Sequence, residues 1–385
     1  MKQIYMDHSA TTPVDQLVVD AMIPYFTEIF GNSSSLHSFG GEAAEALSMA
    51  RKQVAEAIGA LPEEIIFTSG GTESDNLAIR GVIPYNTSKK HIITSVIEHP
   101  AVLNTCSFLE SMGHEVTYVP VDTEGIVDIR KLEESVRKDT VLISIMHANN
   151  EVGTIQPIKE IAQIAKKHDI YFHTDAVQTV GKIPVNVDEL DVDMLSISSH
   201  KIHGPKGVGA LYIRKGTAIE PIIFGGNHEN GMRSGTENIP GIVGLAKAMS
   251  LAQQRLNADS KHMQEMRDSL ISRIFDIIPD VRLNGHPVQR LPNNINLSFK
   301  YVEGESMLML LDMKGIAVST GSACSSKSLK ASHVLSSLNL EDDYIHGSLR
   351  ISLGRENTME DIDYVVESLK ETVLKLREMS PLSSQ

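Results

Sequence analysis

Lys201 is the residue of this sequence with the clearest capacity for covalent chemistry. It lies in SISSHKIHGPKGVG, among serines and histidines and just before a turn rich in glycine and proline. An apolar run precedes this segment, so we expect Lys201 to follow a buried strand. A lysine held there can form an imine with an aldehyde if its surroundings lower its pKa, and Lys206 could add a second cation. Both lysines could instead be solvated loop charges, which is the usual state of lysine.

The stretch FTSGGTESDN, residues 67–76, has the composition of a phosphate-binding turn. An apolar run leads into two glycines, then Thr72, and then a helical pattern whose start is rich in acidic residues. Glycines such as Gly71 let a ligand approach the backbone, and a helix N-terminus offers free N–H groups and a partial positive charge. The alternative is an ordinary strand–turn–helix in which a hydroxyl side chain caps the helix.

Two further polar residues follow predicted strands. Asp175 in HTDAVQ supplies a carboxylate that can keep a heterocyclic nitrogen protonated, which a pyridoxal phosphate ring needs to act as an electron sink. His99 in IEHPAV can stack on a flat ring while one of its nitrogens moves protons. Considered singly, Asp175 could equally cap the next helix, and His99 could be a structural histidine.

The four segments favour one cofactor when they are considered together. A phosphate cradle, an imine-forming lysine, an acid for a ring nitrogen and a stacking histidine all follow predicted strands of one sheet. This combination predicts a pyridoxal phosphate site. His200 and His203 could also suggest a metal site, but no carboxylate or cysteine accompanies them at useful spacing, so we expect no metal.

The segments between these motifs predict a sheet that can position them. Short apolar runs alternate with amphipathic stretches such as residues 157–169, where apolar residues recur at helical spacing. This alternation indicates an α/β fold with a mostly parallel sheet covered by helices on both faces, and ligands bind such sheets beyond the carboxyl ends of the strands. The expected strands are residues 64–69, 91–96, 115–120, 140–146, 170–175 and 193–198.

The last third of the chain predicts a second domain. A long helical pattern from about residue 241 to 278 has a polar middle, QQRLNADSKHMQ, which is typical of a connector. Beyond it, NINLSF, GIAVST and SLRISL are expected strands among helical segments, which indicates a smaller α+β domain. A chain of 385 residues also exceeds the length at which single cores tend to split. We expect a large domain over residues 15–255 and a small domain from residues 1–14 and 256–385.

Composition narrows the class of protein. The formal net charge of −14 argues against nucleic acid as a direct partner, because a phosphate backbone needs a cationic surface. Two cysteines cannot build a disulfide framework, which favours reduced thiols in a cytoplasmic setting. No apolar run approaches the roughly 20 residues that span a bilayer, and the N-terminus has no apolar segment of signal-peptide type. The sequence therefore predicts a soluble cytoplasmic protein with no membrane partner.

The two cysteines lie in different contexts. Cys324 stands in STGSACSSKS, whose small residues neither pack a core nor stiffen the backbone, so we expect a mobile loop at about residues 319–331. Cys106 lies in LNTCSFLE, a helical pattern with apolar neighbours, and is expected to be a buried, inert thiol.

These motifs together resemble the cysteine desulfurases of the NifS and IscS kind, within the class-V aminotransferase group of fold-type I enzymes. The resemblance covers nearly the whole chain and implies a large domain with a mostly parallel seven-stranded sheet plus a smaller α+β C-terminal domain. One departure is Asn230 in HEN, where a basic residue is common in the family, which leaves the local partner contacts open. The matching segments are YMDHSATTPVD, FGNSSSLHSFG, TSGGTES, EHPAV, MHANNEVGTIQP, HTDAVQ, SSHKIHGPKGVG, MRSGTENI, STGSACSSKS and GSLRISLGREN.

The resemblance implies a role for individual residues. Lys201 resembles the Schiff-base lysine, His99 the ring-stacking acid–base, and Cys324 the sulfur acceptor, which makes these three the catalytic residues. Arg350 resembles the arginine that grips the substrate carboxylate, and Asn150 is also implied at the substrate. Thr236 resembles a phosphate ligand donated by the second subunit of a homodimer. The implied cofactor-binding residues are Gly71, Thr72, His99, Asn150, Asp175, Gln178, Ser198, His200, Lys201 and Thr236.

The implied reaction is the pyridoxal phosphate-dependent removal of sulfur from L-cysteine, which gives L-alanine and a persulfide on Cys324. An acceptor protein, such as an iron–sulfur scaffold or a tRNA thiolase, then takes the sulfur for cluster assembly or tRNA thiolation. The alternatives are a selenocysteine lyase or another class V enzyme, although an aminotransferase has no use for a sulfur acceptor such as Cys324. A non-catalytic scaffold is disfavoured because it would need neither Lys201 nor Arg350.

Overall fold

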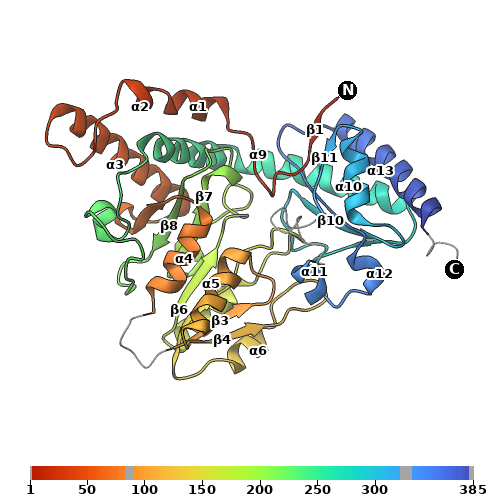
Figure 1. Ribbon diagram of the computed structural model, residues 1–385, viewed down its shortest axis with the longest axis horizontal. Coiled ribbons are helices and arrows are strands. Elements are labelled where there is room, and N and C mark those ends of the chain that lie inside the picture. Colours follow the sequence, from red (N-terminus) through yellow and green to blue (C-terminus); the bar gives the residue numbers. More distant parts are fainter. Residues whose placement is uncertain (1, 84–89, 321–331, 381–385) are drawn as a thin grey trace.

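The computed structural model describes residues 2–83, 90–320 and 332–380. A larger part built on a seven-stranded sheet and a smaller part built on two short sheets are joined by the long helix α9 (Ile239–Ile277), as Figure 1 shows. The strand β1 (Ile4–Tyr5), red in Figure 1, lies beside β11 (Ile316–Ala317) among the blue elements of the smaller part. Segments from opposite ends of the sequence therefore meet there.

The main sheet confirms the prediction of a mostly parallel seven-stranded sheet. Its strand order is β2-β8-β7-β6-β5-β3-β4, and β8 alone runs antiparallel to both of its neighbours. The six predicted strands are all present; β8 was not among them, and it pairs antiparallel with β7 across a short connection. The strands are β2 (Ile65–Thr68), β3 (His91–Ser95), β4 (Glu115–Val119), β5 (Thr140–Ser144), β6 (Tyr171–Asp175), β7 (Met194–Ser198) and β8 (Gly209–Ile213).

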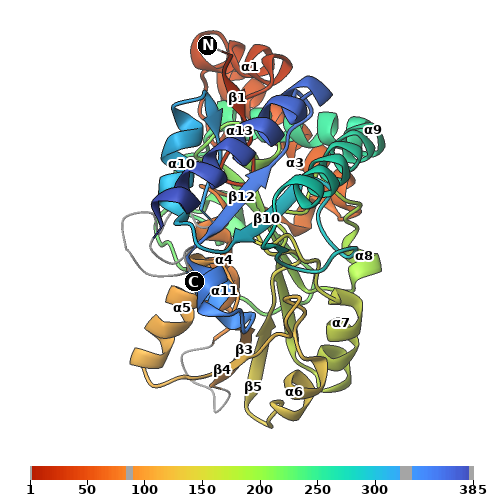
Figure 2. The same cartoon turned by 90° about the vertical axis from the view of Figure 1, so that its right-hand side faces the viewer.

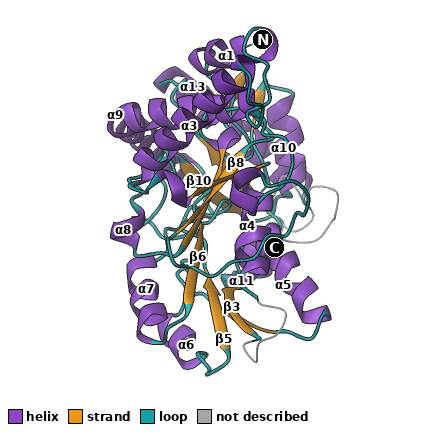
Figure 3. Ribbon diagram, turned by 90° about the vertical axis from the view of Figure 1, so that its left-hand side faces the viewer, coloured by secondary structure: helices purple, strands orange, loops and turns teal. Residues whose placement is uncertain are grey.

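Helices cover both faces of this sheet, because successive strand residues point to opposite faces and both sets are apolar (Figure 3). Ile92 of β3 packs in the cluster of α4 (Gly71–Gly81) and α5 (Pro100–Ser111), whereas Ile93 packs in the cluster on the other face. The helices that contribute to this second cluster include α1 (Gln16–Met22), α3 (Ser38–Ile58), α6 (Ile129–Glu134), α7 (Ile158–Lys167), α8 (Val187–Leu190), the first half of α9 and α11 (His333–Ser337). The short helix α2 (Pro24–Thr27) follows α1.

The helix α9 belongs to two hydrophobic cores. Residues up to Leu251 pack in the core of the main sheet, and residues from Met263 to Ile274 pack in the core of the smaller part. The stretch between Leu251 and Met263 is the polar segment that predicted a connector, and the expected boundary at residues 255–256 falls inside it. The division into two domains at these residues stays a prediction.

The smaller part is an α+β arrangement. A three-stranded antiparallel sheet has the order β12-β10-β9, with β9 (Val281–Leu283), β10 (Asn294–Phe299) and β12 (Ser348–Ser352). The helices α10 (Gly304–Asp312) and α13 (Met359–Met379) and the second half of α9 lie around this sheet in Figure 2. The short helices α11 (His333–Ser337) and α12 (Asp342–Ile345) face the larger part. Across the described residues, no helix is long and apolar enough to cross a membrane.

Candidate active site

A cavity of about 250 Å³ lies at the carboxyl ends of the central strands. Its walls include every predicted site residue except Thr236 and Cys324, namely Gly71, Thr72, His99, Asn150, Asp175, Gln178, Ser198, His200, Lys201 and Arg350. Most of these residues follow the strands β3, β5, β6 and β7, so the parallel arrangement brings them to one edge of the sheet. The walls also contain residues that the sequence analysis did not single out, which are Ser9, Ala10, Asp75, Met146 and Val177.

The N-terminus of α4 opens onto this cavity. Gly70 precedes the helix with φ +150°, a conformation that requires glycine, and no side chain among the described residues caps the helix. A Cβ added at Gly71 would lie 2.8 Å from Val177 Cγ2. The alternative of a hydroxyl-capped helix is therefore excluded, and the backbone N–H groups of the first turn are available to an anion. Ser198 and His200 line the same cavity.

Lys201 ends the short 3₁₀ helix η2 (Ser199–Lys201), directly after β7. Its Nζ donates hydrogen bonds to the backbone oxygens of Ser9 and Ala10, the latter at 2.8 Å. The amine therefore lies inside the cavity and is not a solvated loop charge. By contrast, Lys206 is exposed.

Asp175 is the last residue of β6, and Gln178 follows it in the turn that lines the cavity. Asp175 Oδ1 accepts a hydrogen bond from Val177 N at 2.9 Å within a turn, whereas the next helix, α8, is capped by Asn186, so the alternative interpretation of Asp175 as a helix cap is wrong. Gln178 Nε2 donates to Ser9 O at 3.0 Å, and buried Lys182 donates to Gln178 Oε1 at 3.3 Å, which fixes the orientation of the amide.

His99 is the N-cap residue of α5, and its Nδ1 accepts a hydrogen bond from Ala101 N at 3.1 Å. This bond assigns the proton of the neutral ring to Nε2. Burial, together with the charges of Lys201 and His333, lowers the pKa of His99 to about 4, so the ring is neutral at physiological pH. His99 therefore both caps α5 and lines the cavity.

Arg350 of β12 reaches the cavity from the smaller part. Its Nη2 lies 2.8 Å from Asp7 Oδ1, and its Nη1 donates to Asn150 O at 3.2 Å. The side chain is 2% exposed, and its Nε has no hydrogen-bond partner within the described chain. A buried guanidinium with a free N–H is suited to an anionic ligand such as a carboxylate.

The two remaining predicted residues lie elsewhere. Thr236 is exposed and does not line the cavity. Cys324 lies outside the described residues, as does the rest of segment 321–331. The described flanks of this segment are fixed near the cavity, because Ser319 pairs with Arg350 and the ring of His333 hydrogen-bonds Glu98 O at 3.0 Å.

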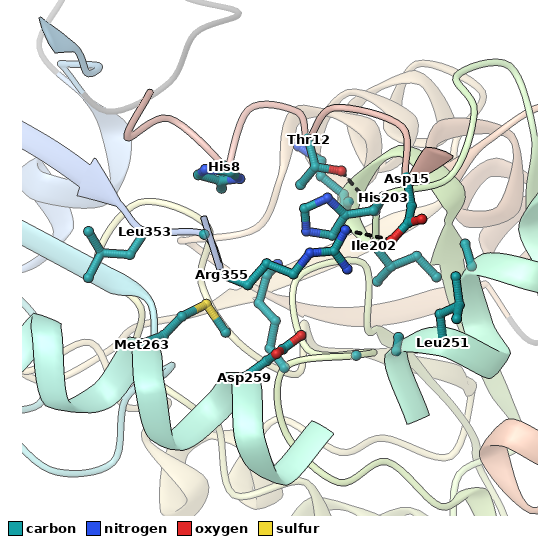
Figure 4. Close-up of a pocket in the computed structure, with 16 residues that line it drawn as sticks. His8, Thr12, Asp15, Ile202, His203, Leu251, Asp259, Met263, Leu353 and Arg355 are labelled. Carbon is teal, nitrogen blue, oxygen red and sulfur yellow. Dashed lines mark hydrogen bonds and ion pairs between the residues drawn. The ribbon is translucent and has the colours of Figure 1, made fainter. Parts of the chain in front are cut away.

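A second cavity lies behind Lys201, between η2, α9 and the loop after β12 (Figure 4). His203 and His8 of its wall lie near Glu356, with candidate ligand atoms of the three residues within 4.8 Å of one another. The prediction of no metal did not include His8 and Glu356, because both are far from His203 in the chain. Glu356 is however already bonded by Arg355 Nε at 2.9 Å, and the cationic Arg355 would oppose a metal ion. The absence of a metal stays a prediction.

Two other expectations can be compared with the structure. Cys106 is fully buried in α5, which confirms its predicted burial, and burial raises its pKa to about 12, as expected for an inert thiol. Asn230 is exposed and has φ +55°, a left-handed conformation that asparagine tolerates better than most residues. Its neighbour Glu229 is buried and binds Arg51 through both carboxylate oxygens at 2.7 Å. The HEN segment therefore combines a structural acid with an exposed amide.

Comparisons with known proteins agree with this geometry. The class-V aminotransferase family matches residues 4–365. A protein described as cysteine desulfurase IscS from Dictyoglomus turgidum is 57% identical over 385 residues, which cover 100% of this chain and 98% of that protein. The cysteine desulfurase IscS of Methanosarcina thermophila is 57% identical over 383 residues, 99% of this chain and 95% of that protein.

Solved structures show the same similarity. A NifS-like protein superposes with a TM-score of 0.91 at 43% identity, over 96% of this chain and 99% of that chain. SspA in complex with cysteine superposes with a TM-score of 0.82 at 38% identity, over 93% of this chain and 100% of that chain.

Proposed function

Because this chain belongs to the class-V aminotransferase family and, within it, to the cysteine desulfurases of fold type I, we propose that its cavity holds pyridoxal phosphate and L-cysteine. The observation that carries this proposal is the convergence of Lys201, Asp175, His99 and Arg350 on one cavity beside an uncapped helix N-terminus. The family is pyridoxal phosphate-dependent, and the residues present fit this cofactor.

The fit rests on the chemistry of the walls. The N-terminus of α4, with Thr72, Ser198 and His200, would hold the phosphate. Asp175 Oδ2 would face the ring nitrogen, His99 would stack on the ring, and Gln178 and Asn150 would contact the phenolic oxygen. When bound, the cofactor supplies an electron sink that labilises bonds at the substrate's α-carbon and, after it, the C–S bond.

The protein's own groups would then move the protons and the sulfur. Arg350 would hold the substrate carboxylate, and Lys201, once its amine is free, would take the α-proton and return it. The Cys324 thiolate would form an S–S bond with the substrate sulfur as the C–S bond breaks. The electrons of that bond stay on carbon, which is protonated and leaves as L-alanine.

The persulfide must leave the cavity to be useful, and we propose that an acceptor protein takes its sulfur for iron–sulfur cluster assembly or tRNA thiolation. We also propose a cytoplasmic homodimer. The Cys324 thiol must be reduced at the start of each turnover, which a reducing compartment ensures, and Thr236, exposed in one chain, is available as a phosphate ligand for the partner.

The test is the reaction of purified protein, loaded with pyridoxal phosphate, with L-cysteine and a reductant. Sulfide and alanine are expected in equal amounts. Cys324→Ser should lose desulfuration, whereas Cys106→Ala, which alters the other thiol inside α5, should keep it. Unchanged sulfide release by Cys324→Ser would show that another group accepts the sulfur.

A further inference from the structure

Beside Asp175, between α4 and the main sheet, lies a group of polar side chains with no part in the steps above. His173 and Asp175 are two residues apart on β6 and therefore point to the same face of the sheet. Ser196 on β7 is paired in register with Asp175. Asp75 comes from α4, which packs on this face. Asp75 is 1% exposed and His173 is 0% exposed, so neither meets solvent.

The hydrogen bonds of this group leave Asp75 without a counter-charge. His173 is fixed between two hydroxyls, with Nδ1 at 2.9 Å from Ser144 Oγ and Nε2 at 2.9 Å from Ser196 Oγ. Asp75 Oδ1 lies 3.7 Å from His173 Nε2 and has no hydrogen-bond partner in the described part of the chain. Burial lowers the pKa of His173 to about 3, so its ring is neutral and forms no ion pair with Asp75.

Asp75 and Asp175 lie in the same buried environment, but Asp175 has more interactions that favour its ionised form. Burial, followed by the charges of Asp175 and Glu98, raises the pKa of Asp75 well above its ordinary value, and the nearby hydroxyl of Ser196 opposes this only in part. Burial also raises the pKa of Asp175, to about 6, but the N–H of Val177 and the charge of Lys201 favour its ionised form. When two carboxyl groups share such a site, the better supported one ionises and the other keeps its proton.

We propose that Asp75 is a positioning residue that carries a proton at neutral pH, so that Asp175 is the single negative charge facing the ring of the bound cofactor. This inference rests on the proposed function, because a single negative charge on Asp175 matters only if a pyridine nitrogen lies beside it. One carboxylate matches one protonated ring nitrogen. A second buried anion would be uncompensated, and buried unpaired charges are costly. The proton on Asp75 also turns that side chain into a hydrogen-bond donor for its neighbours.

Infrared difference spectroscopy of the full-length protein tests where the proton lies. At pH 7 the wild type should show the carbonyl band of a protonated carboxylic acid that is absent in Asp75→Asn and retained in Asp175→Asn. Glu98→Gln identifies the band of the other buried acid, whose pKa is also raised by burial, to about 8. If Asp75→Asn retains every acid band, or if the band disappears in Asp175→Asn instead, the proposal is overturned.

A second measurement covers the case in which Asp75→Asn does not fold. Labelling with ¹³C-aspartate shifts the bands of aspartic acids and leaves that of Glu98 unchanged, so the wild type and Asp175→Asn suffice. A shifted acid band in both proteins supports the proposal, and the absence of any shifted acid band overturns it.

The absorption of bound pyridoxal phosphate provides a readout of the cofactor itself. Since Asn replaces one neutral group by another, Asp75→Asn should move the pH midpoint of the absorption change by less than about 0.5 unit, and Asp175→Asn by more than about 1 unit. Equal shifts in the two variants would contradict a neutral Asp75. Failure of the wild type to bind the cofactor would instead contradict the proposed function, while the infrared assignment would stand.

Discussion

Arg350 Nη2 lies 2.8 Å from Asp7 Oδ1, so the guanidinium proposed to hold the substrate is paired with a carboxylate of the N-terminal segment. Asp7 also lies beside β12 through its bridge to Ser352. A substrate carboxylate entering the cavity would therefore meet an arginine whose orientation is already set, with Nε still free of protein partners in the described residues. Pre-orientation of this kind lowers the entropy cost of binding.

Arg350→Lys should raise KM for L-cysteine by at least about tenfold, because lysine cannot make the paired hydrogen bonds of a guanidinium to a carboxylate. Steady-state kinetics measures this change. Asp7→Asn is the matched control: it keeps the guanidinium and removes only the carboxylate that orients it, so KM is expected to rise by less than in Arg350→Lys. An equal rise of KM in both variants would show that the pair serves stability and not substrate binding.

Lys201→Ala should reduce kcat by at least about 1000-fold, because the proton that leaves the α-carbon loses its acceptor. Reduction with borohydride followed by mass spectrometry should attach the cofactor to the peptide of residue 201 in the wild type and not in the variant. Lys206→Ala changes an exposed lysine of the same loop and should retain both activity and attachment. Normal turnover by Lys201→Ala would refute its assignment.

Mixed dimers of Lys201→Ala and Thr236→Ala test whether Thr236 acts in the partner's site. If it does, one of the two sites in a mixed dimer has an intact Lys201 and receives an intact Thr236, so about half of the wild-type activity should return. Each variant alone should have low activity. No recovery on mixing, with exchange of subunits confirmed by mass, would place Thr236 outside the partner's site.

The fully buried Glu98 should make stability depend on pH. Burial raises its pKa from 4.5 to about 8, so between these values the folded state binds more protons than the unfolded state. The stabilisation is therefore complete below about pH 4.5 and is lost as pH rises through about 8. Glu98→Gln has no such proton to lose. As the pH rises from 4.5 to 8, the free energy of unfolding of the wild type should therefore fall relative to that of Glu98→Gln, by up to about 1.4 kcal/mol per pH unit.

Urea unfolding at several pH values between 5 and 8 measures this difference. Glu45→Gln, an exposed glutamate of α3, is the control and should differ from the wild type by a constant amount. If the difference between Glu98→Gln and the wild type were also constant, Glu98 would titrate normally in the folded protein.

Much of the cavity can be predicted from the sequence because its residues directly follow buried strands. Lys201, Asp175 and His99 each stand after an apolar run, and parallel strands bring such positions to one edge. Asp75 is different: in TESDN it looks like any acidic residue at the start of a helix. Only the packing of α4 on the sheet buries it, and a short stretch of sequence does not show which face of a helix that packing will cover.

Contacts between distant segments are equally hidden. Asp7 and Arg350 are separated by most of the chain, and their pairing depends on β1 crossing to the C-terminal strands. The strand β9 was not predicted because three residues carry little periodicity, and the five-residue antiparallel strand β8 was not predicted either.

Because α9 is one uninterrupted helix, it fixes how one hydrophobic core is rotated relative to the other about the helix axis. Each residue of an α-helix turns the chain by about 100°, so one residue inserted into the polar stretch between Leu251 and Met263 would swing Met263 and the residues after it away from the core they fill. An insertion of seven residues, close to two whole turns, would restore the rotation and only lengthen the helix, by about 10 Å. Arg350 and Lys201 belong to the two parts that α9 joins, so the geometry of the cavity depends on a helix that contributes no residue to its walls.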